Sequence, residues 1–242
     1  GGFIAEPIQA SGGIIIPPKD YLFRMWQVCQ QHDILFIADE VVTAFGRIGH
    51  WFASMDEFGV QPDMITTAKG LTSGYLPLGA LILSDRIWNT MAEGGQRWFT
   101  TGFTYSGHPV SCMAGLKNIE IMEREGMLAN ASKVGAYFNA QLKTLERLPL
   151  VGNVRGRGLM LCVESVANKQ TKDLLPDAAN ESKRISDVAE SLGLIVRPIG
   201  HLNVMSPPLI ITEAQVDFVV ETLGKAITRV TDDLVREGFK LA

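Results

Sequence analysis

Lys69 is the residue whose surroundings in the sequence point most clearly to chemistry. Between residues 64 and 84 it is the only ionisable side chain apart from Tyr75. Apolar surroundings disfavour the charged ammonium and favour the free amine, which is the form that attacks a carbonyl to make a Schiff base. A lone lysine at a strand end is more commonly a surface residue whose ammonium reaches water, and that alternative stays open.

Asp39 directly follows an apolar run over residues 34–38, and the run is typical of a buried strand. Lys69 follows the next apolar run about 30 residues later, a separation typical of one βαβ unit. Because ligands bind at the carboxyl ends of strands in open α/β sheets, both side chains can share one crevice. A carboxylate beside a pyridine nitrogen and an amine suit pyridoxal phosphate. Asp39 and Glu40 could equally cap the helix or turn that follows.

Two further segments have the composition of anion-binding loops. Residues 70–79 are rich in glycine and hydroxyl groups, and residues 100–109 carry Gly102, Thr104, Ser106 and Gly107 before a predicted helix. Glycine permits close backbone approach, and a helix N-terminus favours a phosphate. Such turns more often only connect elements, so neither segment identifies a site by itself.

The elements that must position these residues alternate between strands and helices. Helical periodicity predicts helices over residues 20–31, 109–124, 128–145 and 181–192. Short apolar runs predict strands at residues 1–5, 34–38, 64–68, 80–83, 151–155, 159–164, 194–198 and 202–205. The capping-box spacing of Thr212 and Gln215 begins a last helix that reaches about residue 237. This alternation predicts an α/β fold with a parallel or mixed sheet covered by helices.

Near Pro149 the predicted elements change from long helices to short strands, which predicts two domains. We expect a large domain over residues 1–147 and a smaller α/β domain over residues 148–242. The polar stretch of residues 168–180 is expected to be a loop in the smaller domain.

Composition narrows the classes of partner. The net charge is −4 and the sequence pI is near 5.6, with no block of Lys and Arg, so neither nucleic acid nor a membrane surface is expected. The three cysteines are far apart in apolar surroundings, which favours a reducing, cytoplasmic location. We expect no metal site, no transmembrane segment and no targeting signal.

Taken together, the motifs resemble those of the class III (omega) aminotransferases, which are pyridoxal-phosphate enzymes of fold type I. The matching segments are EPIQ from Glu6, DEVVTAFGR from Asp39, AKGL from Ala68 with GYLPLGA after it, and TYSGHP from Thr104. They occur in family order and at family-like spacings, and the likeness continues to the C-terminus. The chain resembles the C-terminal half of such an enzyme, so we expect this chain alone to be inactive.

The resemblance implies roles for five residues. Lys69 would hold pyridoxal 5'-phosphate as a Schiff base, Asp39 would contact its pyridine nitrogen, and Val41 would pack on one ring face. Thr104 would reach the cofactor phosphate of a neighbouring subunit, in a homodimer or a dimer of dimers. Arg197 would bind the substrate carboxylate, a task that suits a bidentate guanidinium. A solvated arginine at a strand end is the alternative for Arg197.

Two departures from the family pattern indicate the substrates. Ser11 stands where the ornithine and 4-aminobutyrate enzymes carry a glutamate that pairs with the substrate arginine, and Val42 stands where several relatives have glutamine. The resemblance therefore implies transfer from an omega-amino acid, diamine or amine to a 2-oxo acid such as pyruvate.

Three competing interpretations remain. An aminomutase or decarboxylase of the same fold would use the same Lys69 and Asp39. A nucleotide-binding oxidoreductase is disfavoured because no G-x-G-x-x-G follows a strand. A non-catalytic assembly module would keep the fold without its chemistry.

Overall fold

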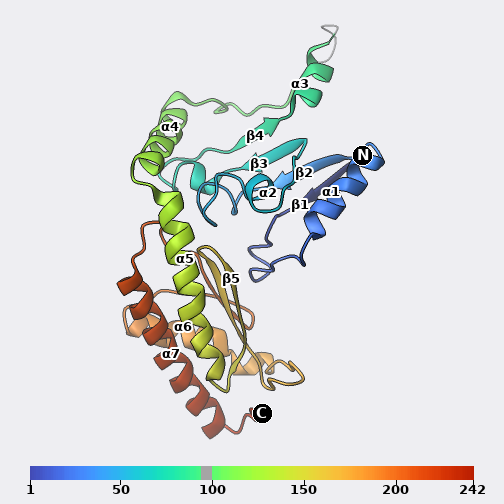
Figure 1. The fold of residues 1–242 in the computed structure, drawn as a ribbon. Helices are drawn as coiled ribbons and strands as arrows, with labels where there is room; N and C mark the ends of the chain where they lie inside the picture. The colour runs from blue at the N-terminus through green and yellow to red at the C-terminus, as the bar shows by residue number, and fades with distance from the viewer. Residues whose placement is uncertain (94–99) are drawn as a thin grey trace. The chain divides into compact units, whose positions relative to one another are not determined.

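The computed structural model describes residues 1–93 and 100–242 (Figure 1). Contacts divide the chain into two compact units. Unit 1 comprises Gly1–Ile8 and Pro17–Leu128, and unit 2 comprises Gln9–Ile16 and Ala129–Ala242. The domain boundary expected between residues 147 and 148 stays a prediction. Within the described residues, no helix is long and apolar enough to cross a membrane.

Unit 1 contains a mixed sheet of four strands. Its order is β1 (Gly2–Ala5), β2 (Leu35–Asp39), β3 (Met64–Thr67) and β4 (Ala80–Leu83). The first three strands are parallel and β4 runs antiparallel to β3, which confirms the mixed α/β sheet predicted from the sequence. Helix α1 (Tyr21–Gln31) connects β1 to β2 and completes the first βαβ unit.

A small apolar cluster fixes α1 against this sheet. Leu22 and Cys29 lie on one face of α1, about two turns apart, and pack with Phe36 of β2 and with Val60. Asp63 then joins β2 to the start of β3, because its carboxylate Oδ2 accepts the backbone N–H of Phe36 at 2.8 Å. The backbone N–H of Asp63 donates to the Phe36 carbonyl oxygen, also at 2.8 Å.

The remaining helices of unit 1 differ in how well the sequence predicts them. Helix α4 (Pro109–Arg124) has the predicted bounds, and Pro109 occupies a position in its first turn that needs no N–H donor. Helices α2 (Ala53–Asp56) and α3 (Asp85–Ala92) and the 3-10 turn η1 (Lys69–Leu71) were not predicted. Helix α2 and the turn η1 each span about one turn, which is too short for a helical period to show. Helix α3 has eight residues, none of them buried.

Unit 2 contains an antiparallel sheet in the order β5 (Val151–Arg157), β6 (Met160–Ser165), β8 (Leu202–Met205) and β7 (Arg197–Ile199). Strand β7 is shorter than the predicted strand over residues 194–198, because pairing with β8 begins only at Arg197. The helical elements are α5 (Met127–Lys143), η2 (Thr144–Arg147), η3 (Asp177–Ala179), α6 (Glu181–Ser191) and α7 (Glu213–Arg236) (Figure 1).

Helix α7 shows the predicted capping box. The backbone N–H of Gln215 donates to Thr212 Oγ1 at 3.3 Å, and the Thr212 N–H donates to Gln215 Oε1 at 2.9 Å. The buried face of α7 joins that of α5 and the inner strands in one core, with members such as Phe138, Leu161 and Leu223.

Helix α5 approaches the β5–β6 turn too closely for any side chain at Gly135. A Cβ built there would lie 2.6 to 2.7 Å from backbone atoms of Gly158, below normal contact distance. Asn139, one turn further along α5, donates to the Gly158 carbonyl oxygen at 3.1 Å. In contrast, a Cβ at Gly224 of α7 would meet only the tip of Leu145, at 3.2 Å.

We therefore predict opposite outcomes for the same substitution in two helices. Gly135→Ala should lower the free energy of unfolding by about 2 kcal/mol, because overpacking against backbone outweighs the helix-propensity gain of about 1 kcal/mol. Gly224→Ala should leave stability unchanged or raise it by up to about 1 kcal/mol. Urea unfolding of both variants tests this, and equal shifts in the midpoint would contradict the close approach at Gly135.

Candidate active site

The structure places Asp39 and Lys69 at the same edge of the unit 1 sheet. Asp39 is the last residue of β2 and pairs with Thr66 on the parallel neighbour β3. Strand β3 ends at Thr67, and Lys69 begins η1 two residues later. The juxtaposition expected from two strands of one βαβ unit is therefore present.

Asp39 keeps one carboxylate oxygen available. Its side chain is half-buried, and Oδ1 accepts the backbone N–H of Val41 at 3.1 Å, as in an Asx turn. Across the described residues, Oδ2 accepts no hydrogen bond. A half-buried carboxylate with an unused oxygen fits a protonated ring nitrogen, which would supply the missing donor. The same Asx turn sets the backbone of half-buried Val41, the residue expected to face the ring.

Lys69 is held in an unusual backbone conformation. Its φ of 35° lies in the left-handed region, which costs energy for a residue with a Cβ. Its ammonium makes no ion pair or hydrogen bond to any residue that the structure describes. An amine without a competing carboxylate is available for covalent chemistry.

The expected apolar setting of Lys69 is wrong for this chain. The residue is exposed in the described structure, so its neighbours in this chain do not enclose its side chain. Many of the apolar residues near Lys69 in sequence belong to β3 and β4, whereas Lys69 itself lies in η1, beyond the end of β3. An apolar stretch of sequence therefore does not by itself give Lys69 an apolar environment.

Asn118 of α4 holds the turn that carries Lys69. Its Nδ2 donates to the carbonyl oxygens of Gly70 at 2.9 Å and Leu71 at 3.2 Å, and its Oδ1 accepts the Ser73 hydroxyl at 2.7 Å. One amide thus satisfies three polar groups of residues 70–73. Sequence reasoning missed Asn118, and its only signal is a polar residue within an amphipathic helix.

Gly70 shows how tightly the same turn packs. A Cβ at Gly70 would lie 2.9 Å from the Cβ of Phe45. Phe45 belongs to the loop that follows Asp39, so this contact joins the two segments of the candidate site. A glycine at position 70 is required by this close approach.

Glu40 organises that loop. It is 0% exposed, and its carboxylate accepts the Thr43 hydroxyl at 2.5 Å, the Ala53 N–H at 3.1 Å and the Ser54 N–H at 2.6 Å. The last two are amides at the start of α2, where a carboxylate is favoured. The capping alternative considered for Asp39 and Glu40 is therefore correct for Glu40, while Asp39 keeps its free oxygen.

Thr104 and Arg197 are both exposed. Thr104 lies in the turn before α4, where the Phe103 N–H donates to the Ser106 hydroxyl at 2.9 Å. Arg197 is the first residue of β7 in unit 2. Neither side chain makes a hydrogen bond or ion pair within the parts of the chain that are described, so both have unused polar groups.

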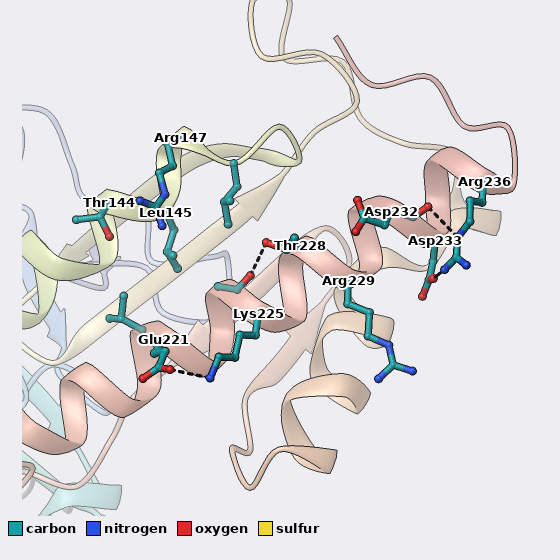
Figure 2. Close-up of a pocket in the computed structure, with 13 residues that line it drawn as sticks. Thr144, Leu145, Arg147, Glu221, Lys225, Thr228, Arg229, Asp232, Asp233 and Arg236 are labelled. Atoms are coloured by element: carbon teal, nitrogen blue, oxygen red, sulfur yellow. Dashed lines mark hydrogen bonds and ion pairs between the residues drawn. The ribbon is translucent and has the colours of Figure 1, made fainter.

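A groove of about 620 Å³ lies in unit 2, between η2 and α7 (Figure 2). Its charged side chains largely pair with each other, as Lys225 does with Glu221 at 2.6 Å and Arg236 does with Asp233 (Figure 2). None of the residues expected to carry chemistry lines it. The groove is therefore a surface feature separate from the candidate site.

Comparison with known proteins identifies the family. The family model for class-III aminotransferases matches residues 1–227. An uncharacterized aminotransferase of Sinorhizobium fredii, y4uB, is 43% identical over 100% of this chain and 52% of its own length. The diaminobutyrate–2-oxoglutarate transaminase of Halomonas elongata is 41% identical over 98% of this chain and 51% of its own length. The putrescine–pyruvate aminotransferase of Pseudomonas aeruginosa is 39% identical, with 93% and 49% covered.

The fold matches solved transaminases as well. An amine transaminase from an uncultivated Pseudomonas species, solved in its PLP-bound form, is 45% identical with a TM-score of 0.90. The match covers 94% of this chain and 52% of that one. This chain thus spans about half the length of the curated relatives it matches. From its sequence motifs, its fold and these matches, the chain belongs to the class-III aminotransferases.

Proposed function

We propose that the enzyme containing this chain is a pyridoxal-phosphate-dependent aminotransferase that uses Lys69 and Asp39. The observation that carries the proposal is their arrangement at one sheet edge, where two adjacent parallel strands end. Asp39 offers an unpaired carboxylate oxygen and Lys69 an unpaired amine, and these are the two groups that the cofactor needs.

Each residue has a distinct task in this proposal. The cofactor, when bound, supplies an electron sink for the bond that breaks at the substrate Cα. Asp39 would keep a proton on the ring nitrogen, and Val41 would pack on one ring face. Lys69 would hold the cofactor covalently through its amine, and the same amine, released when the substrate amine takes its place, would move the proton at the substrate Cα.

The proposed substrates are an omega-amino acid, diamine or amine as donor and a 2-oxo acid, pyruvate, as acceptor. Arg197 would bind the acceptor carboxylate through its unpaired guanidinium. The names of two relatives support a diamine-like donor, since they act on diaminobutyrate and putrescine. Those names differ in the acceptor, 2-oxoglutarate or pyruvate, and the absence of a glutamate at Ser11 favours pyruvate in our proposal.

Assembly and location complete the proposal. We propose a homodimer or a dimer of dimers in which exposed Thr104 reaches the cofactor phosphate of the neighbouring subunit. Large exposed apolar side chains near Thr104 and on α4 support such an interface: Phe103, Tyr105, Val110, Met113 and Leu116. The three cysteines are free thiols in the described structure, which agrees with a cytoplasmic location.

Covalent labelling tests the assignment of Lys69. Borohydride reduction of the full-length enzyme should fix the cofactor on Lys69, and peptide mapping will locate the label. Lys69→Ala should lower turnover at least about 1,000-fold, because both attachment and proton transfer are lost. Lys117, an exposed lysine paired with Glu120, provides the control, since Lys117→Ala should retain label and turnover. A label on any other lysine would refute the assignment.

Replacing Asp39 tests the ring-nitrogen contact. Asp39→Asn should slow proton abstraction about 100- to 1,000-fold, because the charge that keeps the nitrogen protonated is removed. Stability should change little, since Oδ1 of asparagine can still accept the Val41 N–H. Single-turnover rates measure the effect, with exposed Asp56→Asn as the matched control. A rate close to that of the unaltered enzyme would rule out this role.

Asn118 provides a test of the turn that carries Lys69. Asn118→Asp replaces the donor to the Gly70 and Leu71 carbonyls with an acceptor, which should destabilise the turn by about 2 kcal/mol. We expect weaker cofactor retention on dilution, measured by absorbance, and a lower rate of cofactor attachment. The neighbouring exposed variant Lys117→Gln should not change either quantity. If Asn118→Asp retains the cofactor as well as the unaltered enzyme does, the turn that carries Lys69 does not depend on Asn118.

A further inference from the structure

Helix α6 carries three polar side chains that are almost completely buried. Glu181 is 1% exposed, Ser182 is 2% exposed and Ser186 is 8% exposed. Buried polar groups cost stability unless they are hydrogen-bonded, so the partners of these side chains are informative. All of those partners lie in residues 196–203, the segment that contains Arg197.

Two serines of α6 bind the backbone on either side of Arg197. The Ser186 hydroxyl donates to the carbonyl oxygen of Val196 at 2.8 Å, and Val196 immediately precedes Arg197. The Ser182 hydroxyl donates to the carbonyl oxygen of Gly200, at the turn between β7 and β8. These two bonds therefore bracket the short strand that begins with Arg197.

Two more contacts hold the turn and the partner strand. His201 Nδ1 lies 2.7 Å from Glu181 Oε1, and Asn203 Nδ2 donates to the backbone carbonyl of Ser182 at 2.9 Å. Asn203 pairs with Pro198 of β7 in the sheet register. The first turn of α6 thus contacts β8 and the turn between the two strands, and Ser186, one turn later, binds the residue that precedes β7.

Strand β7 is the more weakly held strand of the hairpin, because β8 also pairs with β6. Strand β7 is three residues long, lies at the edge of the unit 2 sheet and pairs only with β8. Its central residue, Pro198, has no N–H to donate. A short edge strand of this kind is a weakly held element, so the contacts from α6 supply much of its restraint.

The backbone around Arg197 is held by hydrogen bonds, whereas its guanidinium is not. The side chain is exposed and makes no hydrogen bond or ion pair among the residues of the described chain. The structure therefore combines a backbone fixed on both sides with a side chain that has kept its freedom. A carboxylate that binds Arg197 therefore does not have to order the backbone that carries the guanidinium, which lowers the entropy cost of binding.

We infer that α6 positions Arg197 for carboxylate binding, with Ser182 and Ser186 as positioning residues. This inference rests on the proposed function, because it assumes that Arg197 binds the substrate carboxylate. It adds a specific claim: the affinity for carboxylate-bearing substrates depends on two hydroxyls that do not touch the substrate. Substrates without a carboxylate should be insensitive to them.

The test separates the two half-reactions of the full-length enzyme. Ser182→Ala, Ser186→Ala and the double variant are compared with Arg197→Ala. The acceptor half-reaction uses pyruvate, and the donor half-reaction uses a simple amine without a carboxylate. Ser191→Ala is the matched control, because Ser191 lies on the same helix, is exposed and bonds only to the Val188 carbonyl oxygen of its own helix, at 2.7 Å.

Each single variant should raise the apparent Kd for pyruvate roughly 5- to 10-fold, as expected for one lost hydrogen bond. The double variant should raise it further, while the maximal rate with pyruvate and both constants for the amine stay within about twofold. Ser191→Ala should match the unaltered enzyme. Faster hydrogen exchange at the amides of residues 197 and 199–204 should accompany the change in Kd, which gives a readout independent of turnover.

Three results would overturn the inference, and they can be distinguished. If Arg197→Ala weakens pyruvate selectively but the serine variants do not, Arg197 binds the carboxylate without help from α6. If the serine variants weaken both half-reactions equally, the serines only stabilise the fold. If Arg197→Ala itself shows no preference for carboxylates, the proposed role of Arg197 fails and the inference fails with it.

Discussion

The parallel pairing of β2 with β3 is the constraint on which the candidate site depends. Asp39 and Lys69 are brought to one edge only because both strands end there. The pairing is fixed at both ends of β2. At the start, the Asp63 carboxylate accepts the Phe36 N–H, and at the end, the Glu40 N–H donates to the Thr66 carbonyl oxygen at 2.9 Å. A shift of the strands by one residue would break both contacts and turn the Asp39 side chain to the other face.

The polar residues of the site fall into two groups that differ in how well their hydrogen bonds are satisfied. Glu40 and Asn118 each have three or more partners, and they order the loops that follow β2 and β3. Asp39 and Lys69 instead retain unused polar atoms within the described structure. Saturated groups contribute rigidity, whereas unsaturated groups are available to a ligand. The number of unused polar atoms therefore distinguishes residues that order the loops from residues that are available to bind a ligand.

Much of this arrangement could be predicted from the sequence, because it follows from local rules. The bounds of α4 and β4, the capping box at Thr212 and the placement of Asp39 after an apolar strand all depend on nearby residues. What could not be predicted depends on contacts between distant segments. Asn118 reaches a turn 48 residues earlier in the chain, and Ser186 binds the carbonyl of Val196, just before a strand whose start the apolar pattern misplaces. The exposure of Lys69 agrees with the surface alternative, which the sequence left open because apolar neighbours along the chain need not surround a side chain in the fold.

The left-handed backbone of Lys69 has a consequence for how this chain can change over evolution. A lysine in that conformation costs on the order of 1 kcal/mol or more, and glycine would relieve that cost. Selection for stability alone would therefore favour glycine at this position, whereas the proposed function requires the amine of a lysine. In a descendant that no longer needed the amine, replacing Lys69 with glycine would raise the stability of the fold. The residue at this position would therefore indicate whether a related protein still depends on the reaction.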